Sequence, residues 1–134
     1  MTLPINDYEF KFHKDFYTPI ASLIKTSTIR LDQKPVKEQD KCYIRFVDSD
    51  YPRILVRITK TYQMKFKDLT YAQATYEGYR HVDLLKHEIR NIYPEITDDT
   101  MVYVYHFSTI EEEKKYKKKI MEDFFDVRKN KNDI

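Results

Sequence analysis

The sequence predicts an α+β protein built on a small barrel or a curved mixed β-sheet, with helices inserted between the strands and a helix at the C-terminus. Short segments of alternating apolar and polar residues are typical of half-buried strands, and segments of helical periodicity separate them. The helices do not follow every strand, so the order disfavours a doubly wound parallel sheet. The 134 residues suffice for one domain with its own core.

In the N-terminal third of the chain, the sequence predicts a strand, a short helix and a second strand. Tyr8, Phe10 and Phe12 alternate with polar residues, which indicates a half-buried first strand. Residues 15–24 then place apolar side chains at helical spacing. We expect this helix to deliver the chain to a second strand over residues 25–31.

That second strand, Lys-Thr-Ser-Thr-Ile-Arg-Leu over residues 25–31, is unusually polar on one side. Strand alternation puts Thr26, Thr28 and Arg30 on the same side of the backbone. A strand that only packed against a core would not present two hydroxyls and a guanidinium there, with Lys25 beside them. The pattern predicts the wall of a polar pocket.

A β-hairpin is predicted in the middle of the chain. Residues 32–40 are polar and read as a loop, and residues 42–46 alternate as a strand. The turn formers of residues 48–52 follow, and a third alternating segment covers residues 54–59.

Two helices are predicted next. Thr70 and Gln73 have the spacing of a capping box, so a helix should run from there to Glu77. Gly78, the only glycine in the chain, suits the left-handed stop that follows. A second helix, with apolar residues on one face, should end before Pro94.

The segment 101–107 is apolar on both faces, which predicts a central, buried strand. His106 within it is expected to be a core residue with a hydrogen-bond partner.

A C-terminal helix is predicted over about residues 109–127, followed by a polar tail at 128–134. Its acidic residues precede its lysines, which complements the helix dipole and permits Glu111–Lys115 and Glu113–Lys117 pairs. Tyr116, Ile120 and Phe124 share one face, which we expect to dock on another surface. We expect residues 1–134 to form a single domain with its core at about 8–108.

Composition excludes several function classes. A net charge of +2 is too small to argue for nucleic acid, and nothing in it points to DNA. The single Cys42 excludes an internal disulfide and fits a reducing compartment. No apolar run approaches the ~20 residues that span a bilayer, so we expect no membrane and a cytoplasmic location. Four histidines without ligand spacing and one glycine predict neither a metal nor a phosphate-binding cofactor.

Five short motifs occur in a distinctive order. They are Lys25-Thr26-Ser27-Thr28-Ile29-Arg30, Asp68-Leu69-Thr70, Glu77-Gly78-Tyr79, Leu84-Leu85-Lys86 leading to Ile92-Tyr93-Pro94, and Val102-Tyr103-Val104 through Phe107. In order and spacing, over roughly residues 8–108, they resemble the ASCH-domain family, which has the PUA-like fold.

The resemblance implies a mixed β-sheet closed into a pseudo-barrel, with a cleft beside the lysine-bearing strand and with the C-terminal helix as an extra element beyond the family domain. It also implies an association with RNA or modified nucleosides. Some small members of the family resemble amidohydrolases that remove acyl groups from N4-acylated cytidine. Carried over residue by residue, their proposed catalytic lysine, threonine and glutamate fall on Lys25, Thr28 and Glu77. Arg30 and Thr26 become candidates for contacting the substrate or RNA.

These residue types are consistent with amide hydrolysis, which needs a nucleophile, a proton acceptor and a group that protonates the leaving amine. Thr28 supplies a hydroxyl, and a neutral Lys25 can accept its proton. Burial or the neighbouring Arg30 cation would favour that neutral form. Glu77 can protonate the amine if burial raises its pKa.

Each residue also has a plainer interpretation. Lys25 would be a solvated lysine, Thr28 a strand former, and Glu77 an exposed helix end. Arg30 would be an ion-pair partner. The sequence therefore leaves catalysis open, together with a non-catalytic RNA-binding module that uses the same cleft. A protein-interaction role for the C-terminal helix is a third possibility, and the oligomeric state is open.

Overall fold

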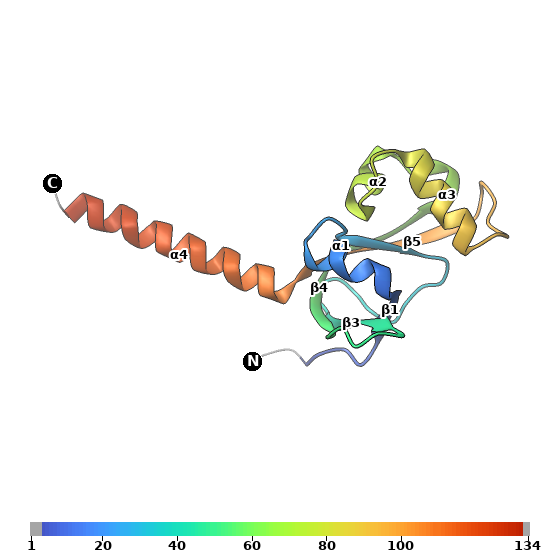
Figure 1. Ribbon diagram of the computed structural model, residues 1–134. Helices are drawn as coiled ribbons and strands as arrows, with labels where there is room; N and C mark the ends of the chain where they lie inside the picture. Colours follow the sequence, from blue (N-terminus) through green and yellow to red (C-terminus); the bar gives the residue numbers. More distant parts are fainter. Residues whose placement is uncertain (1–3, 133–134) are drawn as a thin grey trace.

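The computed structural model describes residues 4–132 and confirms the α+β fold (Figure 1). The strands are β1 (Glu9–His13), β2 (Ser27–Arg30), β3 (Lys41–Val47), β4 (Ile54–Lys65) and β5 (Met101–Thr109). The helices are α1 (Tyr17–Ala21), α2 (Tyr71–Glu77), α3 (Val82–Ile92) and α4 (Ile110–Asn132), with 3-10 turns at Lys14–Phe16 and Phe66–Asp68. None of the helices in this described part has the length and apolar character needed to cross a membrane.

The strands form one mixed sheet in the order β1-β3-β4-β5-β2. β1 runs parallel to β3, and the other neighbours are antiparallel. β5 lies between β4 and β2 and is largely buried, as predicted. β4 continues to Lys65, beyond the predicted end at Thr59, because a register shift between Ile58 and Lys60 lets its second half pair with β5.

The outer strands β1 and β2 approach each other where the sheet curls, and a side chain bridges them. Arg30 Nη2 donates a hydrogen bond to the Lys11 carbonyl oxygen at 3.0 Å. A guanidinium thus joins the two edge strands, which lie at opposite ends of the strand order of the sheet. We call this junction the seam; it is what makes the sheet a pseudo-barrel.

Two clusters of buried apolar residues stabilise the fold. The first packs β1, α1, β3 and the first half of β4 against β5, and it includes Phe10, Phe12, Ile20, Ile44, Phe46, Val56 and Tyr105. The second lies under α2 and α3 and includes Phe66, Leu69, Ala74, Leu85, Ile89, Val102 and Val104. Figure 1 shows α2 and α3 together on one side of the sheet.

The first helix is shorter than residues 15–24, and it ends at Ala21. Leu23 adopts a left-handed φ of 66°, and the backbone amides of Ile24 and Lys25 both donate to the Pro19 carbonyl. The chain reverses here to reach β2, so Ile24 is 60% exposed instead of lying on a helix face. β2 itself begins at Ser27, two residues after the predicted start.

The boundaries of α2 agree with the sequence prediction. Thr70 and Gln73 form the capping box, and Gly78 ends the helix with a φ of 90°. A Cβ at Gly78 would lie 3.3 Å from Ile24 Cγ2. Both this close contact and the left-handed φ therefore disfavour a side chain at this position. This tight stop fixes the position of Glu77, the last residue of the helix.

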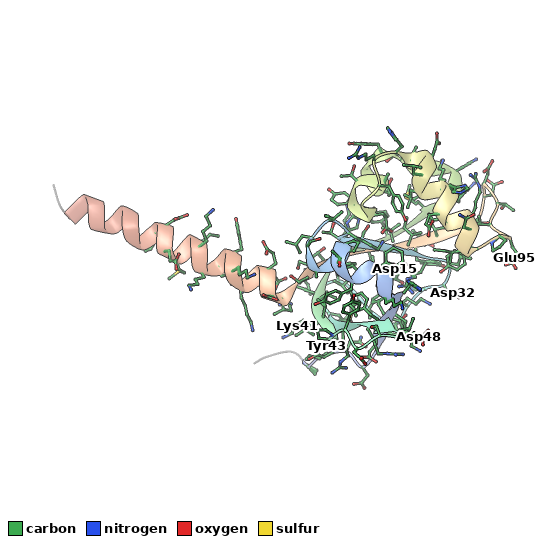
Figure 2. The ribbon with its side chains drawn as sticks, in the orientation of Figure 1. Asp15, Asp32, Lys41, Tyr43, Asp48 and Glu95 are labelled. Carbon is green, nitrogen blue, oxygen red and sulfur yellow. The ribbon has the colours of Figure 1, made fainter. Side chains whose placement is uncertain are left out.

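The C-terminal helix α4 extends to Asn132 and projects from the barrel (Figure 1). It therefore includes residues 128–132 of the predicted tail, because helix propagation gains one hydrogen bond per residue and Arg and Lys are good helix formers. Residues 133–134 lie outside the described part of the chain. On the predicted docking face, Tyr116 is 64% exposed and Ile120 is 47% exposed. Figure 2 shows the side chains drawn on α4 pointing into the space around the helix.

The base of α4 is fixed to the barrel. Thr109 Oγ1 accepts a hydrogen bond from the Glu112 amide, as the capping spacing predicts. Glu113 forms an ion pair with Arg57 at 3.1 Å and accepts a hydrogen bond from the Ser108 hydroxyl at 2.7 Å. Of the two pairs that the spacing permits within the helix, Glu111–Lys115 forms at 3.3 Å. Glu113 instead makes these contacts to β4 and β5.

Candidate functional site

A cavity of about 330 Å³ lies at the seam. Its walls come from β1, the adjoining 3-10 turn, β2, the end of α2, and α3; the lining includes Lys11, Phe12, Phe16, Lys25, Thr28, Arg30, Glu77, Tyr79, Glu88 and Tyr93. Small-molecule sites commonly have volumes of roughly 300–1,000 Å³, so this cavity can hold a ligand the size of a nucleoside.

Lys25 and Glu77 form a buried ion pair in this cavity. They are 6% and 4% exposed, respectively. Lys25 lies just after the chain reversal and Glu77 at the end of α2, so two separate segments meet here. The Lys25 ammonium also lies 5.4 Å from the ring centre of Phe16 and 5.8 Å from that of Phe12. The plainer interpretations, a solvated lysine and an exposed helix end, do not describe these two side chains.

Burial raises the pKa of Glu77 above the usual value for a glutamate, because desolvation disfavours the carboxylate. The Lys25 cation opposes this effect, and Arg30 and the Ser27 hydroxyl oppose it to a smaller extent. Ser27 is itself buried, and its hydroxyl makes no hydrogen bond of normal geometry. Glu77 therefore holds a proton more readily than an exposed glutamate does.

Thr28 and Arg30 lie on the same side of β2, as strand alternation predicted. Arg30 Nε donates to Thr28 Oγ1 at 2.9 Å. The threonine oxygen is thus held by a cation, and its own hydrogen remains available for donation. The guanidinium also packs 4.7 Å from the ring centre of Phe12. Burial lowers the pKa of Arg30, although an arginine stays charged in proteins.

Thr26 does not line this cavity. Its side chain lines a smaller pocket of about 140 Å³ on the other side of Lys25. Thr26 precedes the first ladder residue of β2, and its backbone amide donates to the Tyr76 carbonyl at 2.8 Å. The alternation of β2 therefore begins at Ser27, and it does not extend to Thr26, which was predicted to lie on the same side as Thr28.

Sequence reasoning missed several residues of the cavity wall. The aromatic rings of Phe12, Tyr79 and Tyr93 line it, and Glu88 on α3 adds a second carboxylate. Burial and the nearby Glu88 and Glu77 carboxylates raise the pKa of Tyr79 to about 12, so its phenol stays protonated. Tyr79 and Tyr93 lie within the quoted motifs and could have been suspected, whereas nothing in the pattern marked Glu88.

The chemistry of the cavity is that of protons and hydrogen bonds. Among the side chains that the structure describes, which end at Phe124, there is no group of three or more His, Cys, Asp or Glu residues that could hold a metal ion. A hydroxyl, an amine, a guanidinium and a carboxyl group instead share one partly desolvated space.

A model of the ASCH domain matches residues 8–111, most of the chain. The chain belongs to the ASCH-domain family. This family is generally associated with RNA. The match ends within the first turn of α4, so nearly all of that helix extends beyond the family domain. No curated protein matches the sequence.

Solved ASCH structures share this fold. An ASCH domain from Lactobacillus crispatus JV V101 superposes with a TM-score of 0.63 at 16% identity, covering 75% of this chain and 79% of that one. A protein from Enterococcus faecalis V583 gives 0.60 at 18% identity, with coverages of 85% and 83%. ASCH from Zymomonas mobilis gives 0.57 at 15% identity, with coverages of 75% and 65%. These likenesses establish the PUA-like fold of this ASCH chain.

Proposed function

We propose that this ASCH protein binds a modified nucleoside, free or within RNA, in the seam cavity and hydrolyses the amide of N4-acylated cytidine. One observation carries the proposal: the buried Lys25–Glu77 pair lines the same cavity as Thr28 and Arg30. Buried ion pairs are weak evidence for stability, since apolar residues of similar volume often replace them without loss. A chemical role accounts for a pair that faces a cavity.

The first step depends on where the proton of the pair resides. It starts from the form of the pair in which this proton lies on the Glu77 carboxyl and both groups are neutral, a form that the raised pKa of Glu77 favours. The neutral amine then accepts the proton of Thr28 while the threonine oxygen attacks the acyl carbon. The Arg30 guanidinium holds the threonine oxygen through Nε, and its remaining N–H groups would stabilise the negative charge that develops on the acyl oxygen.

The remaining steps restore the site. Cleavage of the C–N bond transfers the Glu77 proton to the cytidine N4 amine and leaves an acyl ester on Thr28. Water then attacks the ester and gives one proton to the Glu77 carboxylate. The departing Thr28 oxygen takes the proton held on Lys25, and the carboxylic acid leaves. The pair is neutral again, so one water is consumed for each amide.

Recognition of the base is assigned to the cavity walls. Of the five N–H donors of Arg30, the hydrogen bonds to Thr28 and Lys11 occupy two, so others can contact a base oxygen or a phosphate. The rings of Phe12 and Tyr93 supply the apolar surface that a planar base requires.

Release of cytidine from N4-acetylcytidine, followed by chromatography, tests the activity. Glu77→Gln should abolish release, because an amide cannot donate the required proton, and Lys25→Met should do the same. Thr28→Val removes only the nucleophile and keeps the shape of the side chain. Glu95→Gln, on an exposed carboxylate, is the matched control and should retain full activity. Release that survives both Glu77→Gln and Lys25→Met would refute the mechanism.

The second candidate is an RNA-binding module that uses the same cavity without chemistry. The free N–H groups of Arg30 favour it, since they suit phosphate as well as a base edge. RNA affinity should then fall with salt, and Arg30→Ala should weaken it. Affinity at low salt no better than that of an unrelated protein of equal charge would exclude this candidate.

A further inference from the structure

A second concave surface lies against another face of α2. We call it the Tyr76 shelf, and it is lined by Thr59, Lys60 and Tyr62 of β4, Ala72, Gln73 and Tyr76 of α2, and His106 of β5. It shares no lining residue with the seam cavity. Glu77 of the cavity and Tyr76 of the shelf are nevertheless consecutive residues of α2.

A chain of hydrogen bonds fixes the floor of the shelf. Gln73 Oε1 accepts the Thr70 amide at 2.8 Å, which orients the Gln73 side-chain amide to donate to the Tyr62 hydroxyl at 3.3 Å. The Tyr62 hydroxyl also forms a hydrogen bond with His106 Nε2 at 2.9 Å, so the chain of hydrogen bonds reaches the imidazole. Burial and the Lys60 cation lower the pKa of His106, which keeps the ring neutral near pH 7.

The rings of the shelf are arranged as a partly open platform. The Tyr76 ring stands edge-on to His106 with 4.7 Å between ring centres, and its side chain is about half exposed. The Tyr62 ring lies 5.4 Å from the His106 ring. Lys60 is exposed, with its ammonium 5.3 Å from the Tyr62 ring centre. The shelf thus offers fixed ring faces with a cation at the rim.

The lining of the shelf contains no carboxylate, whereas the seam cavity contains two. Aromatic faces stack on bases without regard to sequence, and a rim cation neutralises phosphate. We propose that the Tyr76 shelf binds a nucleotide of single-stranded RNA that flanks the nucleotide held in the seam cavity. This inference rests on the proposed function, because it extends that site along a strand.

A continuous strand explains how so small a surface contributes to binding. One stacking platform and one lysine bind a free nucleotide weakly, but a nucleotide tethered to an occupied cavity is presented at high effective concentration. The shelf therefore distinguishes RNA from a free nucleoside. It should affect the binding of strands and leave the turnover of free N4-acetylcytidine unchanged.

The test measures the affinity of a fluorescein-labelled octauridylate by anisotropy at several salt concentrations. Tyr76→Ala should weaken binding by about fivefold to a hundredfold, the range for loss of one stacked base. Lys60→Ala should weaken it less and reduce the slope of log affinity against log salt by about 0.7. Tyr71→Ala on the same helix and Lys65→Ala on the same strand are matched controls outside the shelf and should change neither quantity.

The outcomes separate the shelf from the cavity. Unchanged binding in Tyr76→Ala, with binding lost in Arg30→Ala, would overturn the shelf and leave the cavity in place. Turnover of N4-acetylcytidine by a protein that binds no octauridylate would overturn the shelf while supporting the proposed function. Binding that depends on Tyr76 but not on Arg30, with no nucleoside turnover, would overturn the proposal that the shelf extends the cavity site, because the shelf would then bind RNA alone. Thermal melting of each variant checks that it is folded.

Discussion

The buried ion pair gives the sharpest stability prediction. Glu77→Gln leaves the Lys25 ammonium in a site where that residue is only 6% exposed. Removing one partner of a buried pair costs about 3–5 kcal/mol. The lower end applies, because the glutamine retains an acceptor oxygen and the Phe12 and Phe16 rings lie beside the cation. We expect a loss of about 3 kcal/mol, which corresponds to a melting temperature roughly 10 °C lower.

Lys25→Met should cost less, because burial already raises the pKa of Glu77 and the unpaired carboxyl can take up a proton. A carboxyl whose pKa is raised on folding stabilises the native state most below its unfolded pKa, and this stabilisation is lost as the pH rises through the folded pKa. The Lys25→Met variant should therefore be more stable at about pH 5 than at about pH 8. The double variant removes both charges and should approach wild-type stability.

Urea unfolding followed by far-ultraviolet circular dichroism gives the four free energies of this double-mutant cycle. The reasoning fails if Glu77→Gln unfolds at the wild-type midpoint. It also fails if the double variant is less stable than Glu77→Gln, because the two side chains would then act independently.

Three further predictions concern single positions. Gly78→Ala should cost about 1–2 kcal/mol from left-handed strain alone, measured by urea unfolding, and should reduce turnover because the neighbouring Glu77 is displaced. Folding lowers the pKa of His106, so wild-type stability should decrease as the pH falls below about 6.5, and a His106→Gln variant should lack that component of a midpoint-against-pH profile. Glu113→Ala should cost less than about 1 kcal/mol in the same unfolding assay, because its pair with Arg57 is partly exposed; a larger loss would mean that α4 stabilises the barrel.

The sequence predicts those parts of the fold that depend on the conformational preference or the polarity of neighbouring residues. Gly78 is such a position, because glycine adopts the left-handed conformation after a helix more readily than any other residue. The central place of β5 follows from its apolar residues on both faces. The meeting of Lys25 with Glu77 was expected only through the family resemblance, since no local rule relates residues in separate segments.

Long-range contacts decide what the sequence could not predict. β4 extends past Thr59 because β5 offers a partner across a register shift, which alternation within β4 does not reveal. α1 ends early because Leu23 is held in a left-handed turn by bonds to the Pro19 carbonyl. Glu113 was predicted to pair with Lys117 on the same helix, but it contacts Arg57 of β4 and Ser108 of β5 instead.

The arginine bridge at the seam has a consequence for how the barrel would hold the ligand that we propose. Beside the cavity, the two outer strands are joined by one guanidinium and not by a row of backbone hydrogen bonds. Separating β1 from β2 should therefore cost less free energy than separating any other pair of neighbouring strands. A nucleotide bound between β1 and β2 would contact both strands and so stabilise their association. Occupancy should accordingly slow hydrogen exchange along both outer strands, even at amides that the ligand never touches.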